Sequence, residues 1–170
     1  MRRVKKLSTA LFVLLFCTGA FAQQKYGHIN SDEILNAMPE FKQMNKTLES
    51  KRMQYASQLQ RMYEDYEKKG AELQQYGQSM MQAIAEERKY ELDSLQMAIM
   101  NFEGSAQEEV QKLQQKLLKP LNDKYLKVVN AVAKENGYTF IFDLSTNIVA
   151  YYPEQSGDIT DLVKQKMGIN

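Results

Sequence analysis

The sequence has 170 residues, of which 44% are hydrophobic and 25% are charged, and its 22 basic and 21 acidic side chains nearly cancel. A balance this close to neutral gives no indication of nucleic-acid binding. The single cysteine, Cys17, rules out a framework of internal disulfides.

The first 22 residues show the three parts of a secretory signal peptide. Four cations precede an apolar run from Ala10 to Cys17, and Ala20 and Ala22 are small residues at the two positions that a signal peptidase reads. The run is too short to span a bilayer, which requires roughly 20 apolar residues. We therefore expect export and cleavage after Ala22.

The alternative to cleavage is a lipoprotein signal in which Cys17 is lipidated, although Phe16 is bulky where such signals have a small residue. Cleavage after Ala22 leaves residues 23–170, which lack cysteine and any further apolar run long enough to cross a membrane. These residues carry 18 basic and 21 acidic side chains, a net charge of −3. The expected product is a soluble, exported, single-domain protein.

A long helical segment follows a short strand that we predict over residues 25–30. The helical pattern covers residues 31–136 and ends at the stop signal Asn136-Gly137. Within it, mostly apolar residues recur at alternating spacings of three and four, which is typical of a coiled-coil seam. The seam positions comprise Met38, Phe41, Asn45, Leu48, Arg52, Tyr55, Leu59, Met62, Tyr66, Lys69, Leu73, Tyr76 and Met80, and then Leu92, Leu95, Ile99, Phe102, Ala106, Val110, Leu113, Leu117, Leu121, Tyr125, Val128 and Val132.

An uncharged stretch, residues 73–85, predicts where this helical segment reverses. One continuous helix of about 105 residues would be roughly 155 Å long, so two antiparallel helices are more plausible. The stretch lies near the midpoint of the segment and contains Gly77, the nearest helix breaker. We expect a hairpin with arms on the order of 70 Å and its tip in this stretch.

Two strands and a short helix are predicted after the hairpin. Residues 138–144 and 147–152 are rich in aromatic and β-branched residues, and residues 158–167 read as a terminal helix. The fold class is therefore mainly α, with a long antiparallel helical hairpin on a few-stranded sheet. In the first of these strands, the face that we expect to be buried carries Tyr138, Phe140, Phe142 and Leu144.

The small predicted sheet has open edges and only half a core. The simplest remedy is an oligomer in which several subunits pool their strands into one body. The alternative is a monomer in which the terminal helix and the roots of the arms cover the sheet.

The sequence contains no pattern of catalytic, cofactor-binding or metal-binding residues. The only histidine, His28, lacks the further ligands of a metal site, so we interpret it as a packed or surface imidazole. There is no glycine-rich phosphate loop and no nucleophile elbow. We therefore predict a protein that is not an enzyme, needs no cofactor and works without ATP.

Methionine is the unusual component of the helical segment. Met62 and Met80 lie on the seam, where they are expected to fill the coiled-coil core. Met81, Met97 and Met100 lie off the seam, and their helical phase places them outward. Flexible, polarizable methionine suits a surface that fits many apolar partners.

The chain resembles the Skp family of periplasmic chaperones, also called OmpH-like proteins. The resemblance rests on the signal peptide, ILNAMPEFK at residues 34–42, the charged hairpin, NGYTFIFDLSTNIVAYY at 136–152 and DITDLVKQKM at 158–167. It implies a homotrimer in which strands of three subunits form a central β-barrel and three helical arms enclose a cavity. Such proteins hold unfolded outer-membrane proteins in the periplasm without ATP.

The resemblance also implies which residues contact a client and which form the oligomeric body. Those placed to contact a client are Met80, Met81, Ile84, Met97, Met100 and Phe102, and those expected in the oligomeric body are Ile29, Phe140, Phe142, Leu144, Ile148 and Tyr152. Better-known members have strongly basic arms, whereas residues 53–87 carry three basic and six acidic side chains here. Lipopolysaccharide binding is therefore not carried over. The alternative function is a structural coiled-coil protein of the cell envelope with fixed protein partners.

Overall fold

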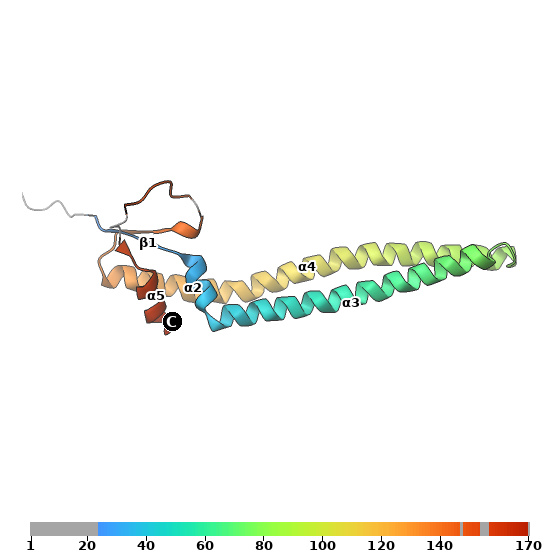
Figure 1. Cartoon of the computed structure of the whole chain (residues 1–170), viewed down its shortest axis with the longest axis horizontal. Coiled ribbons are helices and arrows are strands. Elements are labelled where there is room, and N and C mark those ends of the chain that lie inside the picture. The colour runs from blue at the N-terminus through green and yellow to red at the C-terminus, as the bar shows by residue number, and fades with distance from the viewer. Residues whose placement is uncertain (1–23, 147, 154–156, 170) are drawn as a thin grey trace, which may run out of the picture.

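The computed structural model describes residues 24–146, 148–153 and 157–169, so the predicted signal peptide and Cys17 lie outside the described residues. Two long antiparallel helices, α3 (Pro39–Tyr76) and α4 (Gln82–Glu135), form an arm that projects from a small body (Figure 1). The body contains the remaining elements: β1 (Tyr26–Ile29), α2 (Ser31–Ala37), β2 (Phe140–Asp143), the 3₁₀ helix η1 (Leu144–Thr146), β3 (Gly157–Asp158) and α5 (Thr160–Met167). The structure is thus mainly helical with one small sheet, as predicted.

The first half of the helical segment is divided in two, which the sequence analysis did not predict. Asn30 caps α2 by accepting a hydrogen bond from the Glu33 N–H at 3.2 Å. The chain then becomes extended at Met38 (φ −68°, ψ 125°), and Pro39 begins α3. A residue before proline is disfavoured in the helical region, while proline itself suits the first position of a helix. Pro39 therefore separates α2 from the arm.

The helices reverse between Tyr76 and Gln82, within the stretch predicted to form the tip. Gly77 does not supply a left-handed conformation, because its φ is −56°. It is required for space instead: a Cβ atom there would overlap the Leu73 carbonyl oxygen, which accepts the Gly77 N–H at 2.8 Å. At the other end, α4 stops before Gly137, whose positive φ of 69° suits glycine, as the predicted stop signal requires.

The seam between α3 and α4 follows most of the predicted positions. Leu48, Ile99 and Leu121 are buried. Three predicted positions on α3, namely Asn45, Arg52 and Tyr76, are exposed, and Met44 is buried instead. A straight helix drifts by about 20° per heptad from a strict seven-residue repeat, so a regular series does not stay on the contact face.

The sheet is parallel, with strand order β2-β1-β3. The strand predicted over 147–152 is not observed, because residues 148–153 are irregular and residue 147 lies outside the described residues. The third strand is Gly157–Asp158, which pairs with Gly27 and His28. Strand propensity alone does not make a strand: within the described residues this segment pairs neither with β1, whose two edges are occupied by β2 and β3, nor with the outer edge of β2.

Within the single chain, the side of β2 that packs against the core is not the aromatic face predicted to be buried, and burial of that face in an oligomer stays a prediction. Ile141 packs against the core of the body, whereas Phe140 is 54% and Phe142 is 45% exposed. The core consists of Ile29, Ile34, Tyr125, Val129, Val132, Ile159 and Val163. Because Tyr125, Val129 and Val132 come from the C-terminal end of α4, the root of the arm is part of the body core, and Ile141 is the β2 side chain that reaches it.

The start of α2 is tied to β2 through Asp143. Its Oδ1 accepts hydrogen bonds from the N–H groups of Ser31 and Ser145, each at 3.1 Å. Burial opposes ionisation of Asp143, but hydrogen bonds from these two serines more than offset it and hold the pKa of its carboxyl below the usual 3.8. The ionised carboxylate therefore stabilises the folded body.

We predict that Asp143→Ala lowers the free energy of unfolding by about 1–3 kcal/mol, because the buried Ser31 N–H loses its acceptor. The difference from the parent should be largest at neutral pH and should shrink in strongly acidic solution, where the lowered pKa is crossed and the protonated parent carboxyl is a weaker acceptor. Urea unfolding followed by circular dichroism measures both effects. Asp32→Ala, which removes an exposed carboxylate from the same helix, is the control; equal losses in the two variants would contradict the role of Asp143.

Candidate functional site

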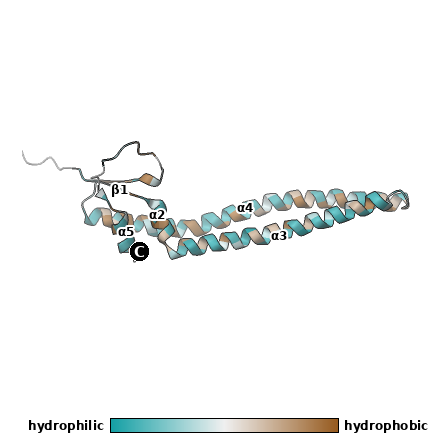
Figure 2. Cartoon of the chain, viewed as in Figure 1, coloured by the Kyte–Doolittle hydropathy of each residue, from teal (hydrophilic) through white to brown (hydrophobic). Residues whose placement is uncertain are grey.

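The arm carries large apolar side chains on its surface. Four residues of the set predicted to contact a client are exposed: Met81 (71%), Met97 (64%), Met100 (64%) and Ile84 (42%). The other two are half-buried: Met80 lies in the turn between the helices, and Phe102 packs edge-on against Tyr55 of α3. Hydrophobic positions occur along α4 among hydrophilic ones (Figure 2). The methionines predicted to be exposed are therefore exposed, whereas Phe102 lies in the seam between the helices and Met80 is half-buried in the turn that joins them.

Further exposed residues of the arm were not in the predicted set. They are Met53, Tyr63, Tyr76, Tyr90 and Leu126. Tyr90 and Met97 are seven residues apart on α4, so they lie on the same side of the helix, and Met100 lies one turn beyond Met97. The seven-residue spacing of Tyr90 and Met97 is visible in the sequence. The sequence does not show, however, whether Tyr90 faces the other helix or water.

The two helices of the arm are also joined by polar contacts. Tyr63 donates a hydrogen bond to Glu103 Oε1 at 3.0 Å, and Lys69 forms an ion pair with Glu91 across the distal seam. Arg88 Nη1 also contacts Glu91 Oε2 at 2.9 Å. Hydrogen bonds from Lys69 and then Arg88 hold the pKa of the Glu91 carboxyl below its usual 4.5. These contacts therefore link the two helices in the distal part of the arm, where most seam residues other than Ile99 are only half-buried.

The body exposes an aromatic surface. Tyr26 stacks on Phe140 and Phe142 with ring centroids 6.0 and 6.3 Å apart, and the two phenylalanines are 6.5 Å apart. Beside them lies a hollow of about 850 Å³ that is lined in part by Leu144 and Tyr152. The exposed residues of the body surface are Tyr26, Phe140, Phe142, Ile148, Tyr151 and Tyr152.

The residues predicted for the oligomeric body fall into two groups. Phe140, Phe142, Ile148 and Tyr152 are exposed in the single chain, and half-buried Leu144 lines the hollow. Ile29 is only 3% exposed and belongs to the core of its own chain, so it is not available to a partner. The reason is that Ile29 and Ile141 lie on the face of the sheet that packs against α4 and α5.

His28 is buried between strands rather than placed in a polar cluster. Its Nε2 lies 3.7 Å from Asp158 Oδ2, and its ring centroid is 5.0 Å from that of Tyr152. Among the described residues, no group of three or more His, Cys, Asp or Glu side chains is arranged to hold a metal ion. Within the same residues, no helix has the length and apolar character needed to span a bilayer.

A body with a long helical arm and this sequence pattern matches a known family. The family model described as outer membrane protein (OmpH-like) matches residues 25–167. The chain belongs to the OmpH-like family. Among curated relatives of this OmpH-like chain, Chaperone protein Skp of Vibrio cholerae is 28% identical over 151 residues, which cover 84% of this chain and 86% of the relative.

Two further comparisons extend over most of the OmpH-like chain. Chaperone protein Skp of Photorhabdus laumondii is 28% identical over 167 residues, 95% of this chain and 98% of the relative. A solved structure described as an OmpH-like outer membrane chaperone of Caulobacter crescentus has a TM-score of 0.70, with 18% identity, and the match covers 84% of this chain and 82% of that one. At this identity the structural likeness shows the shared fold.

Proposed function

We propose that this OmpH-like protein is an ATP-independent periplasmic holdase that binds unfolded outer-membrane proteins between its helical arms and prevents their aggregation. Two relatives named Chaperone protein Skp match 84% and 95% of the chain, which supports a chaperone function. Export through a signal peptide cleaved after Ala22 is part of the proposal. The site of the activity is the exposed apolar surface of the arm.

The observation that carries the proposal is the exposure of Met81, Met97 and Met100 on a rigid hairpin. Contact with an unfolded chain removes apolar area from water, at roughly 25 cal/mol per Å². Methionine is flexible at three bonds, so the same surface adapts to different sequences. A set of such weak, adaptable contacts holds many clients without recognising one sequence.

The proposed active form is a homotrimer whose strands are pooled in a β-barrel, so that three arms surround a cavity. The exposed aromatic residues of the body support this trimer. Tyr26, Phe140 and Phe142 together form an exposed apolar surface, and such surfaces mark sites of interaction. The outer edge of β2 is also unpaired in the single chain.

The test is suppression of aggregation. Several unrelated outer-membrane β-barrel proteins, unfolded in urea, are diluted into buffer with and without the purified protein, and light scattering is recorded in the absence of ATP. We expect protection of each client at stoichiometric amounts, and no protection by an equal mass of a folded protein without arms. Failure to protect any client would leave the structural coiled-coil function as the better interpretation.

A further inference from the structure

The structure separates the methionines of the chain by their exposure to water. Of the ten in the sequence, all but Met1 follow the predicted cleavage site, and no cysteine lies among residues 23–170. Met38 and Met44 are buried in the core at the root of the arm. Three are half-buried, namely Met62, Met80 and Met167. The remaining four are at least 64% exposed: Met53, Met81, Met97 and Met100.

Met97 and Met100 supply the large apolar surface in the middle of α4. Among residues 91–125, all of which the structure describes, they are the only large hydrophobic side chains that are exposed. The run around them, residues 94–102, contains no charged side chain. Met81 lies in the other uncharged stretch, where it is the N-cap of α4. The proposed client surface therefore depends on thioether side chains at both places.

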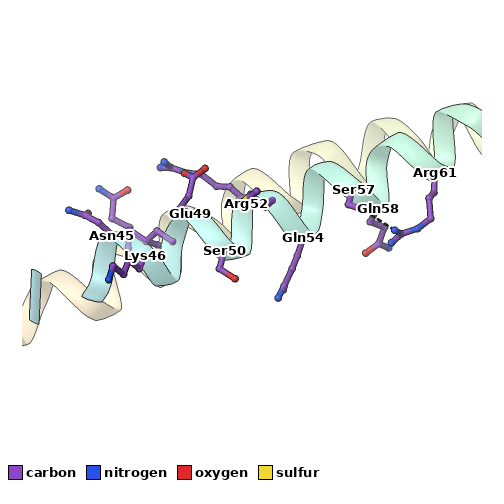
Figure 3. Close-up of a pocket in the computed structure, with 12 residues that line it drawn as sticks. Asn45, Lys46, Glu49, Ser50, Arg52, Gln54, Ser57, Gln58 and Arg61 are labelled. Atoms are coloured by element: carbon purple, nitrogen blue, oxygen red, sulfur yellow. Dashed lines mark hydrogen bonds between the residues drawn. The ribbon is translucent and has the colours of Figure 1, made fainter. Parts of the chain in front are cut away.

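Met53 provides a comparison within the same chain, because its surroundings are polar. It lines a groove of about 1090 Å³ along α3, and most of the other residues that line this groove are polar, including Lys46, Arg52 and Arg61 (Figure 3). Lysine and arginine are hydrogen-bond donors, so an added oxygen atom on the Met53 sulfur has polar neighbours here. Oxidation of Met53 therefore removes little from the apolar surface of α4.

We propose that Met81, Met97 and Met100 form a reversible oxidation site through which a peroxide turns off client holding. The thioether sulfur takes one oxygen atom from hydrogen peroxide: an S–O bond forms, the O–O bond breaks, the sulfur loses two electrons and the second oxygen leaves as water. Methionine sulfoxide reductases reverse the step with two electrons from a dithiol, which becomes a disulfide as water is released. This inference rests on the proposed holdase function.

Exposure accounts for both the selectivity and the effect of this oxidation. The oxidant has to reach the sulfur, so the exposed methionines react ahead of Met38 and Met44, and no thiol of residues 23–170 competes for it. An exposed sulfoxide remains in water, so the helices and the assembly are kept. Contact with an apolar client, however, removes water from the polar S–O group, which opposes binding. The expected product is a folded protein that no longer holds clients.

The first measurement locates the added oxygen atoms and requires no client. The purified protein is treated with hydrogen peroxide and digested, and mass spectrometry of the peptides gives the oxidised fraction at each methionine. We expect sulfoxide at the four exposed methionines while Met38 and Met44 stay reduced, with helix content and oligomeric state unchanged by circular dichroism and sedimentation. Equal oxidation of buried and exposed sites, or loss of the helices, would overturn the inference.

The second measurement links the oxidised sites to client holding. Light scattering of a diluted, unfolded β-barrel protein is recorded with each chaperone before and after treatment, once the peroxide has been removed. The proteins are the parent, a triple variant with Met81→Leu, Met97→Leu and Met100→Leu, and the control Met53→Leu. Leucine keeps a similar apolar volume but has no sulfur to oxidise. Each protein is compared with its own untreated sample.

Oxidation should weaken client binding at least about tenfold in the parent and in Met53→Leu, and should leave the triple variant at its untreated level. The two stereospecific methionine sulfoxide reductases, supplied with a dithiol, should restore the treated parent. Undiminished protection by the treated parent, or an equal loss in the triple variant, would contradict the oxidation site. Lack of protection by the untreated parent would instead remove the holdase function itself, so the two failures are distinguishable.

Discussion

Phe142→Asp is expected to convert the assembled protein into single chains that remain folded. The side chain is 45% exposed and stacks with Tyr26 and Phe140 on the aromatic surface of the body. If that surface is the interior of a trimer, the aspartate carboxylate is buried without a partner, at a cost of several kcal/mol. A loss of about 4 kcal/mol corresponds to a thousandfold weaker association. Sedimentation gives the mass, and circular dichroism gives the helix content.

Two matched variants separate assembly from folding. Ile141→Asp places the same carboxylate on the opposite face of β2, against the core, so it should unfold the body rather than only dissociate it. Tyr90→Asp removes an exposed aromatic residue from the arm and should leave both mass and helix content unchanged. A Phe142→Asp protein with the mass of the parent would show that the aromatic surface has another purpose.

The helical hairpin could be predicted because its signals extend over many residues. A seam of three-four spacing sustained over most of 31–136 cannot be mistaken for strand, and the uncharged stretch with Gly77 marked the reversal. The reason that Gly77 is needed was not predictable, because the close approach of the Leu73 carbonyl exists only in the folded tip. Pro39 was readable, since proline at the first helical position is a sequence signal for a new helix.

The body was harder to predict because its strands are short. Gly157–Asp158 is a strand only through its pairing with β1, and two residues carry no periodicity. In β2, alternation separates Phe140 and Phe142 from Ile141 but does not say which side meets the core. The bulk of Phe140 and Phe142 favoured the prediction that their side is buried. In the single chain, α4 and α5 lie on the other side of the strand, so Ile141 is the residue that packs against the core. The exposed aromatic side then becomes the observation that supports assembly.

The candidate site was partly predictable for a similar reason. Helical phase placed Met97 and Met100 outward because each lies off a clear seam, and both are 64% exposed. Met80 and Phe102 were assigned to the client surface by their place along the arm, but Phe102 packs in the seam and Met80 is half-buried in the turn. The total charge is near zero, so it hides the opposite net charges of the root of the arm (residues 42–61 and 107–127) and of its distal part (residues 62–76 and 82–106). These charges can be assigned only once the hairpin fixes which segments lie together.

Replacing Met81, Met97 and Met100 with glutamate is expected to abolish most client holding while leaving the protein folded and assembled. The three side chains are 71%, 64% and 64% exposed, so the arm loses little packing. Full burial of a methionine side chain contributes about 1.5–3 kcal/mol, so losing part of that at three positions weakens client binding at least about tenfold. Light scattering of diluted, unfolded β-barrel proteins measures the loss. Met80 is left unchanged, because its side chain is half-buried in the turn between the helices.

A second triple variant distinguishes lost apolar surface from added charge. Gln78→Glu, Gln96→Glu and Gln111→Glu add three carboxylates at exposed positions of the arm without removing a methionine. If client holding depends on adaptable apolar contact, this control should protect nearly as well as the parent, because its carboxylates can remain in water beside the bound client. Equal losses in the two variants would mean that negative charge alone repels clients. Full protection by the methionine variant would move the holding surface to the remaining exposed apolar residues of the arm, which are Met53, Tyr63, Tyr76, Ile84, Tyr90 and Leu126.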